Sequence, residues 1–202
     1  MADFNNFQNC LFRITSPLIF DMNHDGQVSA KLGLGITLNP DHPERHQGAA
    51  VNGDKMLAMS DLNSNGVIDI SEVFGDQTVN PVTGKPLNAQ NGFVALFMVA
   101  QIMQDLNPES QIITNQERST LVAIPALQAA LRQVGHDLGF ISDNNVSQLE
   151  PIRDVIAVDV TDYIETPDDV RSGMTYAQKG FYLDNQNRAW EVVDVWFRNS
   201  NE

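Results

Sequence analysis

Hydrophobic residues recur at helical spacing in two parts of the chain. Between residues 93 and 104 they follow the i, i+3, i+4, i+7 pattern of a helix with one buried face: Phe93, Leu96, Phe97, Ala100 and Met103. A second helix is expected to begin near Pro125, since proline suits the first position of a helix. Its apolar stripe consists of Leu127, Leu131, Val134 and Leu138.

Other apolar runs are rich in β-branched and aromatic residues, which favours strands. Strands are expected within residues 11–20, where Pro17 interrupts the run, and at 156–160. The C-terminal part predicts a hairpin with arms at about 174–183 and 188–197, because a short Asx-rich turn separates two β-prone runs.

Long stretches between these elements carry many turn-forming residues. Residues 33–60 and 75–92 contain repeated Pro, Gly and Asn and are expected to be loop-rich. This mixture of short strands, helices and loops predicts the fold class α+β. We expect an N-terminal segment of residues 1–16 followed by a single domain of residues 17–202.

Composition narrows the function. The 202 residues carry a formal net charge of −14, so we expect no nucleic-acid partner, because such binding relies on basic surfaces. The sequence lacks a run of about 18 apolar residues, so no membrane insertion is expected. The 18 Asp outnumber the 8 Glu. Because Asp is less favourable than Glu inside helices, this excess points to loops or metal sites.

The strongest candidate for chemistry is residues 61–72, which match a complete EF-hand loop. Calcium prefers six to eight oxygen ligands, and the loop offers them at fixed positions. Gly66 permits the sharp turn at position 6, and Ile68 at position 8 is expected to tie the loop to the core. The candidate ligands are Asp61, Asn63, Asn65, the backbone carbonyl of Val67, Asp69 and the bidentate Glu72.

A second loop begins at Asp21 and matches the same pattern less completely. Its candidate ligands are Asp21, Asn23, Asp25 and Gln27, with Val28 in the position of the apolar plug. Position 12 is Leu32, so a remote carboxylate must complete the site. Asp54 and Asp41 are both possible, and spacing does not decide between them. The sequence thus predicts Ca²⁺ as the bound ion, at one complete site and a second incomplete one.

Two tryptophans near the C-terminus allow two interpretations. Trp190 and Trp196 are an even number of residues apart, so they share one face of a strand. They could form a carbohydrate platform, but packing against the core is the favoured interpretation.

These motifs together resemble the calcium-binding modules of bacterial RTX-type exoproteins. The resembling segments are residues 17–26, 61–78, 91–96 and 194–197, whose order and spacing cover almost the whole chain. The resemblance implies a calcium-stabilised structural or interaction module. It also implies type I export without a cleaved signal, with a cytoplasmic location as the alternative. A protein or glycan at the cell surface is the expected partner.

In part of this family, calcium-induced folding triggers cleavage of an Asp-Pro bond at the start of the module. Here Ser16 precedes Pro17, and none of the nine prolines follows Asp. Catalysis is therefore not expected. A calcium-activated self-processing module and a calcium-dependent adhesin or matrix-binding domain stay open as alternatives.

Overall fold

The protein is mostly β in this computed structural model, which describes residues 16–37 and 47–197 except 144, 167 and 173. These ranges contain thirteen strands, two α-helices and one short 3₁₀ helix. The expected α+β class is therefore wrong. The elements are β1 (Leu18–Phe20), β2 (Ala30–Thr37), β3 (Gln47–Ala50), β4 (Lys55–Met59), α1 (Gly92–Leu106), η2 (Pro108–Ser110), β5 (Ile113–Asn115), β6 (Thr120–Ala123), α2 (Ile124–Gln133), β7 (Leu138–Ser142), β8 (Asn145–Glu150), β9 (Val155–Asp159), β10 (Ile164–Glu165), β11 (Val170–Arg171), β12 (Met174–Asp184) and β13 (Ala189–Phe197).

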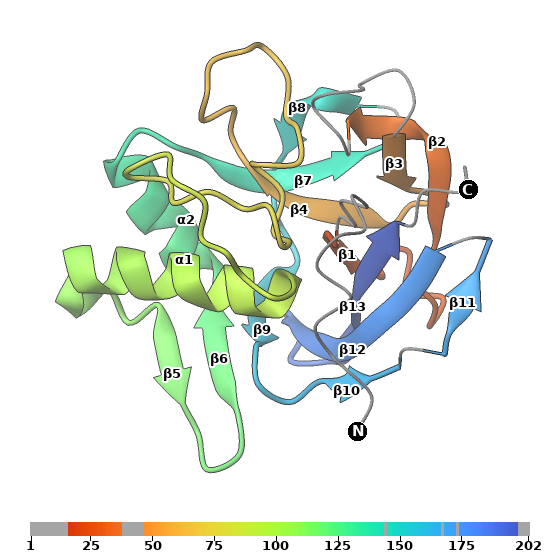
Figure 1. Ribbon diagram of the computed structural model, residues 1–202. Helices are drawn as coiled ribbons and strands as arrows, with labels where there is room; N and C mark the ends of the chain where they lie inside the picture. Colours follow the sequence, from red (N-terminus) through yellow and green to blue (C-terminus); the bar gives the residue numbers. More distant parts are fainter. Residues whose placement is uncertain (1–15, 38–46, 144, 167, 173, 198–202) are drawn as a thin grey trace, which may run out of the picture.

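Eleven strands form one antiparallel sheet, and β2 and β3 form a separate pair (Figure 1). The order along the main path is β5-β6-β9-β12-β13-β1-β4-β7-β8, with β10 and β11 paired to β12. The short strand β1 lies between β13 and β4, so segments from the two ends of the described chain meet in the middle of the sheet. Because β1 and β4 are antiparallel, the end of β1 lies beside the start of β4.

The central strands are buried on both faces, and alternate side chains enter two different hydrophobic cores. In β1, Leu18 and Phe20 belong to the first core, whereas Ile19 belongs to the second. The same division separates Leu57 from Met56 in β4. Strands buried on both faces lose the alternation of polar and apolar residues. This loss explains why β4, within residues 33–60, shows no strand pattern in the sequence.

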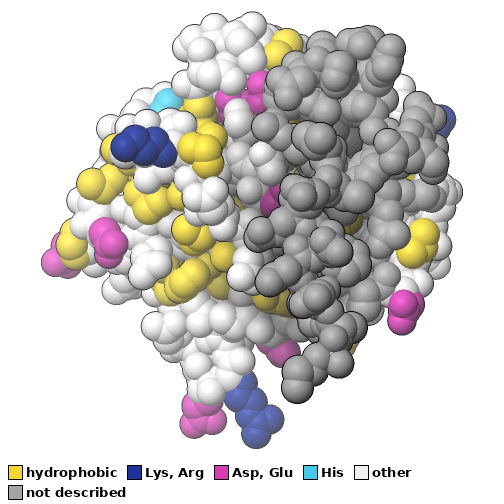
Figure 2. Space-filling model, in the orientation of Figure 1, with side chains coloured by type: hydrophobic (Ala, Val, Ile, Leu, Met, Phe, Trp, Pro, Cys, Tyr) yellow, Lys and Arg dark blue, Asp and Glu magenta, His cyan; other side chains and the backbone are white. Residues whose placement is uncertain are grey.

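The first core is covered by the two helices. Helix α1 confirms the expected helix near residues 93–104, and α2 starts at Ile124 with proline in its first turn, as expected. The predicted stripe of α2 extends too far, because the helix ends at Gln133 and Leu138 begins β7. Apolar side chains of α1 reach the surface on the face that Figure 2 shows. The lysine and arginine side chains on this face are separated from one another.

The second core is covered by the β2–β3 pair and by the two predicted calcium loops. Ile36, Ala49 and Ala50 come from the strand pair, and Val28, Ile68 and Ile70 come from the loops. The C-terminal hairpin is confirmed as β12 and β13, which join at residues 185–188. The strand expected at 156–160 is confirmed as β9, displaced by one residue.

Candidate functional site

The two predicted calcium loops have the same backbone conformation at their turning points. We call residues 21–29 loop 1 and residues 61–72 loop 2. At position 4, His24 and Ser64 have positive φ angles of 60° and 59°. At position 6, Gly26 and Gly66 have φ angles of 84° and 86°. Such angles are costly for residues with a side chain, which explains glycine at position 6 of both loops.

In both loops, polar side chains accept hydrogen bonds from the backbone N–H groups at equivalent positions. In loop 1, the two carboxylate oxygens of Asp21 accept from Asp25 at 3.2 Å and from Gly26 at 2.9 Å. In loop 2, the oxygens of Asp61 accept from Asn65 at 3.1 Å and from Gly66 at 2.7 Å. The side chains at positions 3 and 5 repeat this agreement, each accepting from the backbone two residues ahead.

One buried carboxylate closes each loop. It accepts hydrogen bonds from the backbone N–H groups at positions 2 and 9. In loop 2 this carboxylate is Glu72, with Oε1 3.3 Å from the nitrogen of Leu62 and Oε2 3.0 Å from that of Asp69.

In loop 1 the closing carboxylate is Asp54, with Oδ1 3.2 Å from the nitrogen of Met22 and Oδ2 2.7 Å from that of Ser29. Asp54, one of the two remote carboxylates considered for loop 1, therefore accepts from the same two positions as Glu72 does in loop 2. The other candidate, Asp41, lies outside the described residues.

The sheet register explains how Asp54 reaches loop 1. Phe20 of β1 pairs with Lys55 of β4. The residue after Phe20, Asp21, therefore lies beside the residue before Lys55, Asp54. The chain then runs along β4 and enters loop 2 at Asp61, so β4 connects the closing carboxylate of loop 1 to the first ligand candidate of loop 2.

Both loops are fixed to the second core by the residue at position 8. Val28 is 1% exposed and Ile68 is 4% exposed, and both belong to the second core. This confirms the role expected of these two apolar residues. The polar ends of both loops remain at the surface, since Asn23, Asp25, Asn63 and Asn65 are exposed.

The closing carboxylates are electrostatically unfavourable as free anions. Burial raises the pKa of Glu72 from 4.5 to about 7, with a further contribution from Asp69. Burial also raises the pKa of Asp54 from 3.8 to about 6, and the charge of Asp21 adds to this rise. The ion pairs recorded within residues 16–37 and 47–197 involve other acids, namely Glu150, Asp137, Asp169 and Asp184.

The oxygen donors of the loops suit a hard cation such as calcium. Each loop, counted with its closing residue, contains three carboxylates, Asn at one or two positions and a position-7 carbonyl, which are the kinds of oxygen that calcium prefers. Within the described part of the chain, however, no group of three or more His, Cys, Asp and Glu side chains is arranged to hold a metal ion. The carboxylate oxygens instead accept hydrogen bonds from backbone N–H groups.

Loop 1 has additional support from the C-terminal hairpin. The hydroxyl of Tyr182 donates to the carbonyl of Asp21 at 2.6 Å. The ring of His24 stacks on Trp190, with ring centroids 4.0 Å apart, and its Nε2 lies 3.2 Å from the Tyr182 hydroxyl. Trp190 packs against the first core, which confirms the interpretation favoured for it from the sequence.

A further cluster of carboxylates, which no sequence motif predicts, lies at the start of β1. The backbone N–H of Ser16 donates to Asp76 at 3.3 Å, and the hydroxyl of Ser16 accepts from the N–H of Asp76 at 3.3 Å. Asp194 is fully buried nearby and accepts from the N–H of Gly92. Burial raises the pKa of Asp194 well above its usual value. Only the fold brings these residues together, because they lie far apart in the chain.

The fold and the two loops define a β-rich module with acidic, glycine-containing loops on one face of its sheet. The chain is similar to the iron-regulated protein FrpA of Neisseria meningitidis serogroup C, with 30% identity over 63% of the chain. It spans 13% of the length of that relative. No family model matches the chain. This distant similarity suggests a module related to the exoproteins whose motifs the sequence resembles.

Neither helix in the described ranges has the length and apolar character needed to cross a bilayer.

Proposed function

We propose that the protein is a calcium-stabilised module with one Ca²⁺ site in each loop. The ligands in loop 2 are Asp61, Asn63, Asn65, the carbonyl of Val67, Asp69 and Glu72. The ligands in loop 1 are Asp21, Asn23, Asp25, the carbonyl of Gln27 and Asp54. The observation that carries this proposal is the repeated arrangement of the closing carboxylate, which meets positions 2 and 9 in both loops.

Three buried acids favour a bound cation. Asp21, Asp54 and Glu72 are each 0% exposed, and a buried carboxylate is unfavourable unless it is neutralised. A bound divalent cation would supply that charge. Because the loops carry side chains of the second core, holding them in place also stabilises the β2–β3 side of the sheet. Calcium binding then contributes directly to the free energy of folding.

The biological setting follows from the similarity to the iron-regulated protein. A calcium-dependent module of an exoprotein would fold fully after export, where calcium is abundant. A glycan or protein at the cell surface would be its partner. A cytoplasmic location and an adhesin role remain the alternatives carried over from the sequence.

Calorimetric titration of chelator-treated protein with CaCl₂ tests the proposal. We expect two binding events and a higher melting temperature in calcium than in chelator. With free calcium at 100 times the dissociation constant, each site adds about 2.7 kcal/mol to the free energy of unfolding. An unchanged melting temperature together with an absence of binding heat would refute the proposal.

A self-processing function is disfavoured by the residue at the start of the module. The family chemistry uses an Asp carboxylate before the proline, and Ser16 has a hydroxyl in that position. We therefore expect the same intact mass for the purified chain with and without calcium. A calcium-dependent fragment beginning at Pro17 would contradict this expectation.

A further inference from the structure

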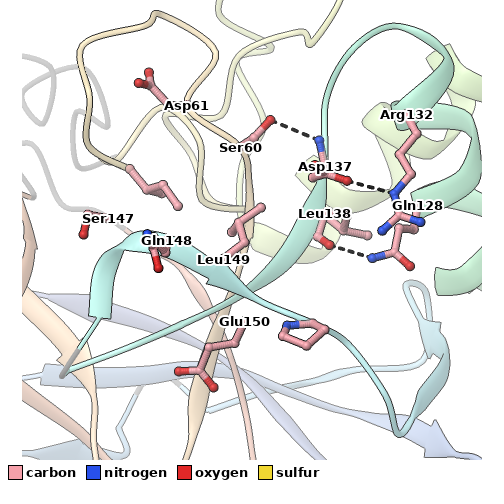
Figure 3. Close-up of a pocket in the computed structure, with 12 residues that line it drawn as sticks. Ser60, Asp61, Gln128, Arg132, Asp137, Leu138, Ser147, Gln148, Leu149 and Glu150 are labelled. Carbon is pink, nitrogen blue, oxygen red and sulfur yellow. Dashed lines mark hydrogen bonds and ion pairs between the residues drawn. The ribbon is translucent and has the colours of Figure 1, made fainter.

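A pocket lined by both polar and apolar side chains lies next to loop 2, between helix α2 and strand β8 (Figure 3). Its volume is about 560 Å³, within the range of roughly 300–1,000 Å³ that is usual for sites that bind small molecules. Gln128 and Arg132 come from α2, Leu138 comes from β7, and Leu149 comes from β8. Asp61 and Ile68 of loop 2 complete the wall.

Hydrogen bonds hold one side of this pocket in a defined arrangement. Ser60 and Asp137 bond reciprocally, since the N–H of Ser60 donates to the carbonyl of Asp137 at 2.8 Å and the N–H of Asp137 donates to the Ser60 hydroxyl at 3.1 Å. Nε of Arg132 donates to Oδ1 of Asp137 at 2.8 Å, and Nε2 of Gln128 donates to the carbonyl of Leu138 at 2.8 Å. Figure 3 shows these groups gathered on the same side of the pocket.

These bonds leave both donors and acceptors available to a ligand. Arg132 and Asp137 are 60% and 61% exposed, and no other partner within the described residues bonds the terminal nitrogens of Arg132 or Oδ2 of Asp137. Oε1 of Gln128 is a further acceptor.

Three acids line the pocket: Asp137 pairs with Arg132, Glu150 pairs with Lys55, and Asp61 would be neutralised by the proposed calcium ion. This balance favours a neutral ligand over an anion. Leu149 and Pro151 provide apolar surface beside these polar groups.

We propose that this pocket binds one neutral sugar residue of a glycan. A sugar hydroxyl both donates and accepts hydrogen bonds, so neighbouring hydroxyls match an arginine beside a carboxylate and an amide oxygen. The C–H face of the ring would lie against Leu149 and Pro151. This inference deepens the proposed function, because it assigns the expected glycan partner to a site and places that site away from Trp190.

The pocket is also connected to the proposed calcium site. Asp61 is the first ligand of loop 2, Ile68 is its plug residue, and both line the pocket. Ser60, which bonds to Asp137, directly precedes Asp61. The position of these pocket residues therefore depends on the conformation of loop 2. Because calcium would fix that conformation, we expect calcium to strengthen sugar binding.

An array of immobilised glycans, probed with the labelled full chain in calcium, tests the sugar site. We expect binding to a subset of neutral glycans. The Arg132→Gln and Gln128→Ala variants should bind the best of these glycans about tenfold more weakly or worse in calorimetry. Arg118→Gln is the matched control, because Arg118 is exposed between β5 and β6, does not line the pocket, and loses the same charge. Calcium-dependent melting should be the same in all three variants.

The possible outcomes separate this inference from the calcium proposal. Binding restricted to sialylated or sulfated glycans, or binding that survives both pocket substitutions, would overturn the sugar site. Two calorimetric calcium events without binding to any glycan would overturn the sugar site alone. Glycan binding of equal strength in chelator would overturn its dependence on calcium and leave the sugar site standing.

Discussion

Loop 1 and loop 2 share their backbone turns and their internal hydrogen bonds but differ in the source of the closing carboxylate. Loop 2 closes on its own residue, Glu72. Loop 1 closes on Asp54, which belongs to the segment before β4 and reaches the loop through the pairing of β1 with β4. The comparison shows that a sheet register can replace sequence spacing in placing a closing carboxylate beside a loop.

The loops also differ in how far the rest of the protein supports them. Asp21 is buried and its carbonyl accepts from Tyr182, whereas Asp61 is partly exposed. His24 stacks on Trp190, whereas Ser64 at the same position of loop 2 is exposed. Loop 1 should therefore keep its shape without calcium better than loop 2 does.

The largest expected effect comes from the plug residues. Ile68→Ala should reduce the free energy of unfolding by about 2–5 kcal/mol, because it removes buried carbon atoms from the second core and leaves a cavity. Val28→Ala removes fewer atoms and should cost about 2 kcal/mol. Urea unfolding in calcium measures both values. If Ile68→Ala unfolds at the same urea concentration as the unsubstituted chain, Ile68 does not anchor loop 2 to the core.

The pH dependence of the calcium-free protein should give the next largest effect. The pKa of Glu72 is about 7 in the folded state against an ordinary value of 4.5. The folded protein therefore holds a proton more tightly than the unfolded chain does. The resulting stability is fully present below about pH 4.5 and is lost as the pH rises through 7, a change on the order of 3 kcal/mol.

Calcium affinity should change in the opposite direction, since protons compete with calcium for the closing carboxylates. Loop 2 should lose affinity as the pH falls below about 7, and loop 1 only below about 6, in accordance with the pKa values of Glu72 and Asp54. Calcium titrations at a series of pH values would resolve the two sites. A single, shared pH dependence would contradict this difference between the loops.

The smallest effect concerns the aromatic support of loop 1. His24→Asn keeps a residue that tolerates positive φ but removes the stacking on Trp190, which should cost about 0.5–1.5 kcal/mol. Calcium binding should weaken in loop 1 only. Ser64→Asn is the matched change in loop 2 and should leave the free energy of unfolding and the calcium affinity unchanged. If the two substitutions changed the calcium titrations equally, the stacking on Trp190 would not give loop 1 more support than loop 2 has.

Local signals in the sequence were sufficient for the helices, the hairpin and the loops. The stripe from Phe93 to Met103 has helical spacing, and the turn at residues 185–188 separates two β-prone runs, so each element is specified by its own residues. Gly26 and Gly66 mark the loop turns in the same way. These features depend on neighbours in sequence, which is why they were predicted correctly.

Features that depend on distant pairing could not be predicted in this way. Strands β4 and β7 are buried on both faces and so lack alternation, and Leu138 was assigned to a helical stripe instead. The position of Asp54 beside loop 1 depends on the register of β1 with β4, which the sequence does not show. The cluster of Ser16, Asp76 and Asp194 likewise exists only because β1 lies beside β13 and the Asp76 turn.

The calcium stoichiometry of Asp54→Asn tests the central claim most directly. We predict two calcium ions for the unsubstituted chain and one for Asp54→Asn, with the same reduction in Glu72→Gln. Asp105→Asn is the control, because Asp105 is an exposed acid in α1 and should leave the stoichiometry at two. Two calcium ions bound by folded Asp54→Asn, at the affinities of the unsubstituted chain, would contradict the role assigned to Asp54.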